Sequence, residues 1–119
     1  MAAGAVHTLP KKERLSGRTD IARLLEKGRY GSTSCLRYCY LTGTGLPYGR
    51  IMVSVPKRHF KRAVRRNLLK RRIRESYRRQ KDLLVPGTDV MFIYKPSEML
   101  SYPEIYSAME AALKDISAE

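Results

Sequence analysis

The chain has 119 residues, 43% of them hydrophobic, so it is long enough for one globular domain with a core of its own. It carries 24 Lys and Arg against 11 Asp and Glu, a formal net charge of +13. This composition excludes a wholly disordered protein, and no apolar run is long enough to span a membrane. The N-terminus has no recognisable secretory signal, so a cytoplasmic location is expected.

Residues 1–13 are small, polar or basic and are expected to form a loose arm ahead of a single domain over residues 14–119. The first helix is predicted from Asp20 to Lys27, with Thr19 as its N-cap and the following glycine as its stop. Its apolar face consists of Ile21, Leu24 and Leu25.

Three later segments have the composition of β-strands. Residues 36–41 and 50–55 are rich in strand-forming side chains and flank a loop with three glycines, so they are predicted to run antiparallel. Residues 89–94 form a mostly apolar run, which is typical of a buried strand.

Two more helices complete the expected order of elements. A proline ends the second strand, and a long helix is predicted from near His59 to Asp82. Ser101 and Glu104 resemble a capping box at the start of the last helix. The apolar face of that helix consists of Ile105, Met109, Ala112, Leu113 and Ile116. This order indicates an α+β domain in which helices cover one sheet.

The cysteines and histidines do not form a recognisable metal site. A structural zinc site needs four ligands, whereas Cys35 and Cys39 are the only cysteines and the two histidines show no paired spacing. In an extended segment, residues four apart are too distant for a disulfide. Two reduced thiols in or near the core are expected, with metal or redox chemistry as the alternative.

The positive charge is concentrated in one segment. Residues 57–81 hold 13 basic side chains and one acid, Glu75, which leaves 11 basic and 10 acidic residues elsewhere. A charge so localised repels itself, so it indicates a polyanionic partner. A membrane-surface helix needs a broad apolar face with large anchors, and this segment has only a narrow apolar stripe.

Helical geometry divides this segment into an apolar and a polar stripe. Leu69, Ile73 and Tyr77 recur every four residues and are predicted to pack on the sheet. The polar stripe consists of Asn67, Lys70, Arg71, Arg74 and Arg78, and the far flank of Arg65, Arg72 and Arg79. A merely solvated face would be supported by intrahelical ion pairs, for which acids are almost absent here. Guanidinium groups bind phosphate in a bidentate manner, so the polar stripe is predicted to follow a nucleic-acid backbone with strong salt dependence.

The segment from Lys57 to Arg78 resembles the signature of the bacterial ribonuclease P protein family. Its pattern is a basic pair, a short spacer, Ala-Val, then Arg-Asn-x-x-Lys-Arg-x-x-Arg-Glu and an aromatic residue. The resemblance extends over nearly the whole chain. It implies an α-β-β-β-α-β-α sandwich with the basic helix in a left-handed crossover between two parallel strands, against the usual right-handed rule.

The resemblance also implies partners and contact residues. The partners are a catalytic RNA that cleaves precursor tRNA with Mg²⁺, and the precursor tRNA itself; no organic cofactor, membrane or further protein partner is expected. The implied RNA-binding residues are Lys57, Arg58, Arg62, Arg65, Arg66, Asn67, Lys70, Arg71, Arg74 and Arg78. A cleft between the first helix and the sheet would hold the 5′ leader, at Arg14, Ile21, Leu25, Arg37 and Cys39.

Two features depart from the family pattern. Leu68 stands where the family often has an arginine, so one RNA contact is missing, and Arg65 or Arg72 can compensate. The leader positions offer apolar contact but no aromatic ring for stacking. Tyr38 or Tyr40 would supply a ring only if the strand register were shifted by one residue.

The size and charge of the chain do not by themselves distinguish this function from two others. A structural RNA-binding protein of the ribosomal type matches the size and charge equally well, and a DNA-binding regulator is a third alternative. No catalytic residue and no metal ligand is expected in this chain, since its carboxylates are scattered and His59 has no orienting partner. Replacing Arg66, Lys70 or Arg74 by alanine is expected to weaken RNA binding and to leave the fold intact.

Overall fold

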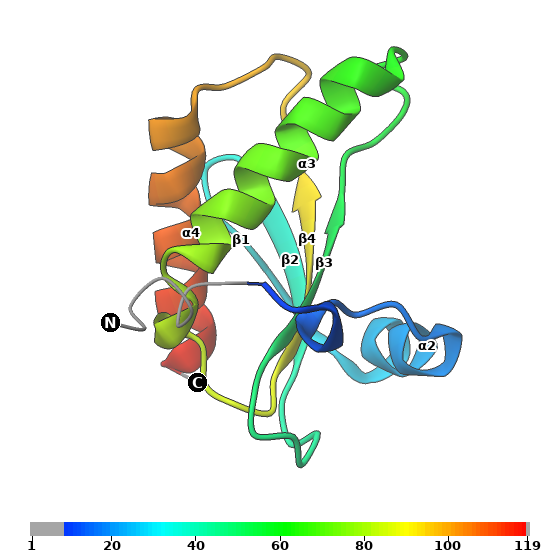
Figure 1. The fold of residues 1–119 in the computed structure, drawn as a ribbon, viewed down its shortest axis with the longest axis vertical. Helices are drawn as coiled ribbons and strands as arrows, with labels where there is room; N and C mark the ends of the chain where they lie inside the picture. Colours follow the sequence, from blue (N-terminus) through cyan, green and yellow to red (C-terminus); the bar gives the residue numbers. More distant parts are fainter. Residues whose placement is uncertain (1–8, 119) are drawn as a thin grey trace.

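Four strands form one mixed sheet in the computed structural model, which describes residues 9–118 (Figure 1). They are β1 (Arg29–Ser32), β2 (Leu36–Leu41), β3 (Arg50–Ser54) and β4 (Asp89–Tyr94), in the spatial order β1-β2-β4-β3. β4 pairs antiparallel with β2 and parallel with β3. The strands predicted over residues 36–41, 50–55 and 89–94 are confirmed, with the second ending one residue earlier, at Ser54. The first two run antiparallel as expected, although β4 lies between them.

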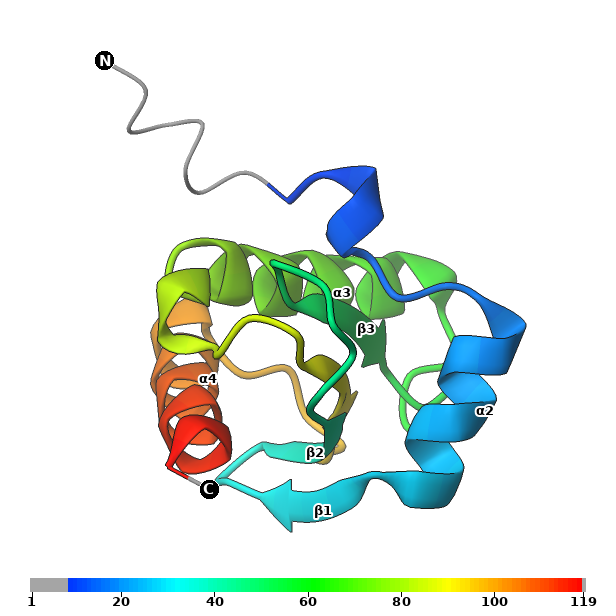
Figure 2. The same ribbon diagram turned by 90° about the horizontal axis from the view of Figure 1, so that it is seen from below.

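Helices cover both faces of this sheet. They are α2 (Arg18–Lys27), α3 (Ala63–Arg78) and α4 (Tyr102–Ser117), with the short 3₁₀ helices η1 (Lys11–Glu13) and η2 (Lys81–Leu83). Figure 2 shows α3 and α4 on one face and α2 on the other. The larger core cluster lies under α3 and α4, where Leu69, Ile73 and Tyr77 are buried as their spacing predicted. A smaller cluster under α2 contains Leu24 and Cys39.

The basic helix α3 connects the two parallel strands. In Figure 1 the chain runs up β3, returns along α3 in front of the sheet, and then runs up β4 to the left of β3. Figure 2, seen from below, also shows α3 next to β3 and on the side of the sheet away from α2. A helix on this side, with the second parallel strand to the left of the first, makes a left-handed crossover. The α-β-β-β-α-β-α order and its left-handed crossover are therefore confirmed.

α3 is shorter at both ends than the helix predicted over residues 59–82. The chain before it forms a turn, in which His59 N donates to Pro56 O at 3.3 Å. After it, Gln80 is buried and its side-chain amide donates to Tyr106 O of α4 at 3.1 Å. The start of α3 is therefore set by a local turn and its end by a contact with α4, and helical periodicity reports neither.

α2 begins two residues earlier than predicted, so Thr19 lies inside the helix and does not cap it. The predicted end is confirmed, since Gly28 N donates to Leu24 O at 2.8 Å. A Cβ at Gly28 would come within 2.6 Å of Cys39 Sγ, so the chain passes too close to β2 for a side chain here. Leu24 is fully buried but Leu25 is 46% exposed, which makes the apolar face narrower than predicted.

Part of the loose arm expected over residues 1–13 is folded, while residues 1–8 lie outside the described residues. Glu13, in η1, is buried, and its carboxylate accepts a hydrogen bond from Lys81 Nζ at 2.9 Å. Both partners of this ion pair are shielded from solvent. It attaches the beginning of the described chain to the segment that follows α3.

The last helix agrees with the prediction. Ser101 Oγ accepts a hydrogen bond from Glu104 N at 3.5 Å, and Glu104 Oε1 accepts one from Ser101 N at 3.3 Å, which completes the capping box. The predicted apolar face is buried throughout: Ile105, Met109, Ala112, Leu113 and Ile116.

The two cysteines are free and buried, as predicted. Cys35 belongs to the larger core cluster and Cys39 to the cluster under α2. Burial raises the pKa of both thiols, which favours their protonated form at neutral pH. In residues 9–118, no helix combines the length and the apolar character needed to cross a membrane.

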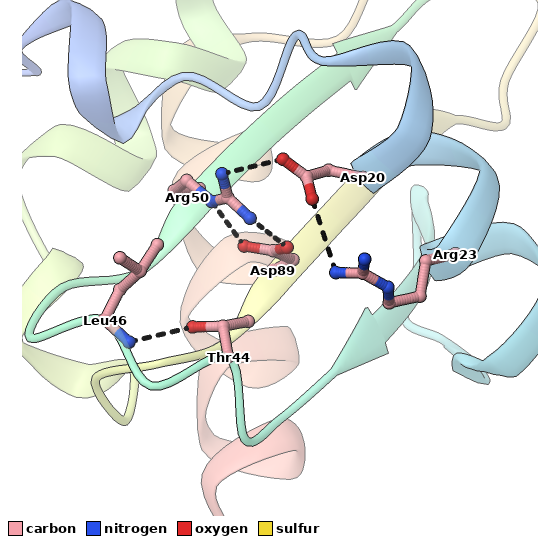
Figure 3. A network of polar contacts seen from close by, with 6 residues as sticks. All are labelled: Asp20, Arg23, Thr44, Leu46, Arg50 and Asp89. Carbon is pink, nitrogen blue, oxygen red and sulfur yellow. Dashed lines mark hydrogen bonds and ion pairs between the residues drawn. The ribbon is translucent and has the colours of Figure 1, made fainter.

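A network of charges fixes α2 on the sheet (Figure 3). Arg50, the first residue of β3, donates through Nε and Nη2 to the carboxylate of Asp89 at 2.8 and 2.7 Å. Its Nη1 donates to Asp20 of α2 at 3.1 Å. The Asp89 side chain is only 5% exposed, so the bidentate hydrogen bonds from Arg50 replace contacts with water.

Arg50→Ala is expected to lower the free energy of unfolding by about 3 kcal/mol, because it leaves the buried carboxylate of Asp89 without a partner. Urea unfolding monitored by circular dichroism measures this loss. Arg23→Ala is the matched control, since its 3.4 Å contact with Asp20 is more exposed and should contribute less than about 0.5 kcal/mol. Equal losses in the two variants would contradict the assigned role of Arg50.

Candidate nucleic-acid interface

The polar stripe of α3 lines a hollow of about 520 Å³ on the protein surface. All five residues of the predicted stripe lie there: Asn67, Lys70, Arg71, Arg74 and Arg78. The hollow forms because the helix buries the neighbouring stripe, so its polar side chains project along one edge of the sheet. Within the lining, Glu75 is the single acid against five cationic side chains, counting Arg14. The predicted grouping of these five residues on one surface is confirmed.

Arg14 lies in this hollow, apart from the leader residues with which it was grouped. It forms an isolated parallel bridge with Ile51 of β3, and the next residue, Leu15, donates from its N to Ile51 O at 2.7 Å. This pairing brings the N-terminal segment alongside α3. The structure therefore corrects the placement of Arg14, which extends the cationic surface of α3.

Arg14 and Arg74 both line this hollow. Burial, and then the charge of Arg14, lower the pKa of Arg74. Arg74 nevertheless remains charged at neutral pH, because arginine titrates far above that range. Cationic side chains gathered in one hollow favour the binding of an anion such as a phosphate.

Glu75 neutralises part of the same surface. Its carboxylate accepts hydrogen bonds from Arg78 Nε and Arg79 Nε, each at 2.8 Å. The bond from Arg78 lowers the pKa of Glu75 from 4.5 to about 2, with a smaller contribution from Arg79. Because the folded-state pKa is depressed, these ion pairs stabilise the protein above pH 4.5 and are lost as the pH falls through about 2.

Glu75→Gln is expected to strengthen RNA binding about threefold, because it removes the negative charge nearest to the hollow and releases two guanidinium groups. The logarithm of the binding constant should also fall more steeply with salt, by about one unit of slope. Titration of a labelled RNA at several salt concentrations measures both quantities. Weaker binding would instead show that Glu75 is needed to orient Arg78.

Two other cationic residues of α3 make structural contacts. Arg66 Nη1 donates to Phe60 O at 2.7 Å and to Lys61 O at 2.9 Å, which holds the turn before the helix. Arg72 Nη1 donates to Leu100 O at 2.7 Å, in the loop between β4 and α4. Alanine at Arg66 would remove both contacts, so a loss of order in this turn is now expected together with weaker RNA binding. Arg72 donates to the loop, so Arg65 and Arg79 are the exposed arginines on that flank.

The remaining predicted cations lie at the start of α3. Lys57 and Arg58 are exposed in the turn that precedes the helix, where Arg58 Nε lies 3.4 Å from His59 Nε2. Arg62 is the N-cap residue and lines a second hollow with Arg65. The structure thus divides the ten predicted RNA-binding residues between the central hollow and the start of the helix.

The face of the sheet under α2 holds the other predicted leader residues. Cys39 is completely buried, and its Sγ lies 3.4 Å from Leu24 O, so its side chain is covered by the helix. Ile21 packs partly buried against the same cluster. Arg37, two residues before Cys39 on β2, is exposed on this face. Ile21 and the exposed Leu25 lie on α2, whereas Arg37 lies on β2.

An aromatic side chain does lie on this face, at a position that the sequence had not indicated. Tyr30 of β1 pairs with Cys39 of β2, which places both side chains on the α2 side of the sheet. Tyr30 is 60% exposed, and its hydroxyl donates to Leu25 O at 3.1 Å. Tyr38 and Tyr40 are buried on the opposite face, so neither supplies the ring.

Residues 9–117 match the family model of ribonuclease P. The chain belongs to this family. It is 34% identical over 106 residues to the ribonuclease P protein component of Nitrosomonas europaea, a match covering 89% of this chain and 88% of that protein. It is 40% identical over 86 residues to the Porphyromonas gingivalis protein of the same name, where the match covers 71% of this chain and 63% of the relative.

A solved structure in the ribonuclease P family has the same architecture. The ribonuclease P protein from Thermotoga maritima superposes with a TM-score of 0.77 at 28% sequence identity. The superposition covers 87% of this chain and 97% of that one. Family membership therefore rests both on the sequence and on the fold. Among residues 9–118, no group of three or more His, Cys, Asp or Glu side chains is placed to hold a metal ion.

Proposed function

We propose that this chain is the protein subunit of ribonuclease P and that it binds the catalytic RNA through the hollow on α3. The observation that carries the proposal is the convergence of Arg14, Asn67, Lys70 and Arg74 on one concave surface, in a chain of this family. Guanidinium and ammonium groups neutralise phosphates, while an asparagine amide both donates and accepts toward a ribose or base edge. A hollow with both types of group suits a folded RNA backbone.

The division of labour follows from the family. The RNA subunit, with Mg²⁺, cleaves precursor tRNA and leaves the mature 5′ end, and the protein supplies positive charge and positioning. Charge of this kind lowers the repulsion between two RNA molecules, so it reduces the concentration of Mg²⁺ that the reaction needs. No side chain of this chain is assigned a catalytic role.

The 5′ leader of the precursor is proposed to lie on the α2 side of the sheet. Tyr30 offers an exposed ring for stacking and Arg37 a cation for a phosphate. Ile21 supplies apolar contact at the edge of α2. Cys39 is covered by α2, so it supports this face from beneath and is not proposed to touch the leader.

Tyr30→Ala is expected to weaken binding of a precursor tRNA to the assembled enzyme by about fivefold or more, because one base loses its stacking surface. Binding of mature tRNA, which has no leader, should not change. Tyr30→Phe is the control, since it retains the ring and loses only the bond to Leu25 O. The proposed leader contact is excluded if both tRNAs respond equally.

The experiment that tests the proposed function is cleavage of a precursor tRNA by a bacterial ribonuclease P RNA at low Mg²⁺, with and without this protein. The protein is expected to stimulate cleavage at the mature 5′ end. Tight, salt-dependent RNA binding without any stimulation would instead indicate a structural RNA-binding protein and would refute the proposal.

A further inference from the structure

An apolar hollow lies at the N-terminal end of α3, away from the central cationic one. Its volume is about 540 Å³, within the usual range for a small-molecule pocket. Phe60, which is buried, and the partly buried Met99 contribute apolar surface from outside the helix. Val64 and Leu68, one helical turn apart, complete that surface, and they are 71% and 37% exposed.

A cationic hollow adjoins the apolar one. It has a volume of about 280 Å³ and shares Phe60 and Arg65 with its neighbour. Its other lining residues are His59, Lys61 and Arg62, so it contains no acid. The apolar hollow contains a single acid, Glu98. An anionic group is therefore favoured on the Arg62 side and an uncharged ring on the Leu68 side.

We infer that these two hollows together bind one unpaired nucleotide of the RNA partner, with the base against Val64 and Leu68 and a phosphate beside Arg62 and Arg65. This inference rests on the proposed function and adds a base contact to the phosphate contacts of the central hollow. A nucleotide joins an apolar ring to an anion, which is the pairing of surfaces found here. Leu68, which stands where the family often has an arginine, would thus contact a base of the RNA in place of a charged contact.

The positive charge around the apolar hollow favours RNA over a second copy of this protein as its ligand. Exposed apolar surface on an otherwise cationic helix marks a binding site. A second copy of this chain would bring a further +13 of charge toward the same cations, and the repulsion would oppose its docking. RNA brings charge of the opposite sign, and single-stranded positions of RNA expose their bases to proteins.

The test uses the full chain and a bacterial ribonuclease P RNA as the probe. The double variant Val64→Ser with Leu68→Ser removes the apolar surface and retains every charge. Its affinity for the RNA is expected to fall about tenfold, as when one base contact is lost, while the dependence on salt stays unchanged. The matched control is Leu83→Ser with Val85→Ser, which alters two apolar residues that are 36% and 47% exposed beyond the end of α3. This control should bind as the wild type does.

A crosslinking experiment identifies the occupant directly. Val64 is replaced by p-benzoylphenylalanine, and irradiation of the complex is expected to join it to an unpaired nucleotide of the RNA. Crosslinks to a second copy of the protein would overturn the inference. So would unchanged affinity of the Val64 and Leu68 double variant, and in that case the proposed function would still stand. If the wild-type protein does not bind the RNA at all, both the proposed function and the inference fail.

Discussion

Ile73→Asp is expected to abolish the folded domain. The Ile73 side chain is fully buried in the core under α3, with Leu69 and Tyr77 on the turns before and after it. A carboxylate in that position loses its hydration and gains no cationic partner in the core, because the arginines of α3 project from the other side of the helix. The loss of stability should exceed about 4 kcal/mol, which is a large part of the stability of a small domain.

The expected result of this substitution is loss of the cooperative thermal transition and of most helical circular dichroism. Ile73→Val is the matched control, because it removes one methylene group and should cost only about 1 kcal/mol. If the aspartate variant unfolds cooperatively near the wild-type temperature, then α3 is not packed through this residue. In that case the division of the helix into buried and RNA-facing stripes would also be wrong.

Helical periodicity was a reliable guide to the two stripes of α3, because their arrangement depends only on local geometry. Residues four apart lie on one face of any α-helix, so burial of Leu69 and Ile73 leaves Lys70 and Arg74 together on the neighbouring face. The same reasoning correctly placed the apolar face of α4, whose start is also marked by a local capping box.

The roles of individual arginines could not be predicted in this way. Arg66 and Arg72 look like their neighbours in the sequence, but each donates to backbone carbonyls outside the helix. Arg14 joins the hollow only because the chain before α2 pairs with the edge of β3. These contacts depend on which segments the fold brings together, and a single sequence carries no local signal for them.

The aromatic residue on the leader face was missed for a different reason. β1 has four residues, three of them exposed, so its sequence lacks the alternation of apolar and polar side chains that indicates a strand. Gly31 further weakens the strand pattern, and its role is tertiary, since a Cβ there would collide with the ring of Tyr38. Only the pairing of β1 with β2 shows that Tyr30 lies on the α2 side.

The double variant Lys70→Ala with Arg74→Ala is expected to weaken binding to ribonuclease P RNA on the order of 100-fold, if each loses one charge-assisted bond of roughly 1.5 kcal/mol. Both side chains line the central hollow, and neither is needed by the core. The circular dichroism and the unfolding transition should therefore stay close to wild type, and stimulation of cleavage at low Mg²⁺ should be lost. Because phosphate contacts release counterions, the slope of log affinity against log salt should become shallower by about two units.

The control for this variant is Lys114→Ala, which removes a positive charge from α4, where Lys114 is paired with Glu110 at 3.3 Å. The double variant removes two positive charges and this control removes one, so a loss of net charge alone would weaken RNA binding to the same extent per charge removed at both places. If RNA binds in the hollow, the RNA affinity of the Lys114→Ala control and the dependence of that affinity on salt should both stay near the wild-type values. Comparing the change of slope per charge removed therefore separates a site on α3 from the general attraction of a basic protein to RNA, and equal changes per charge would contradict the site.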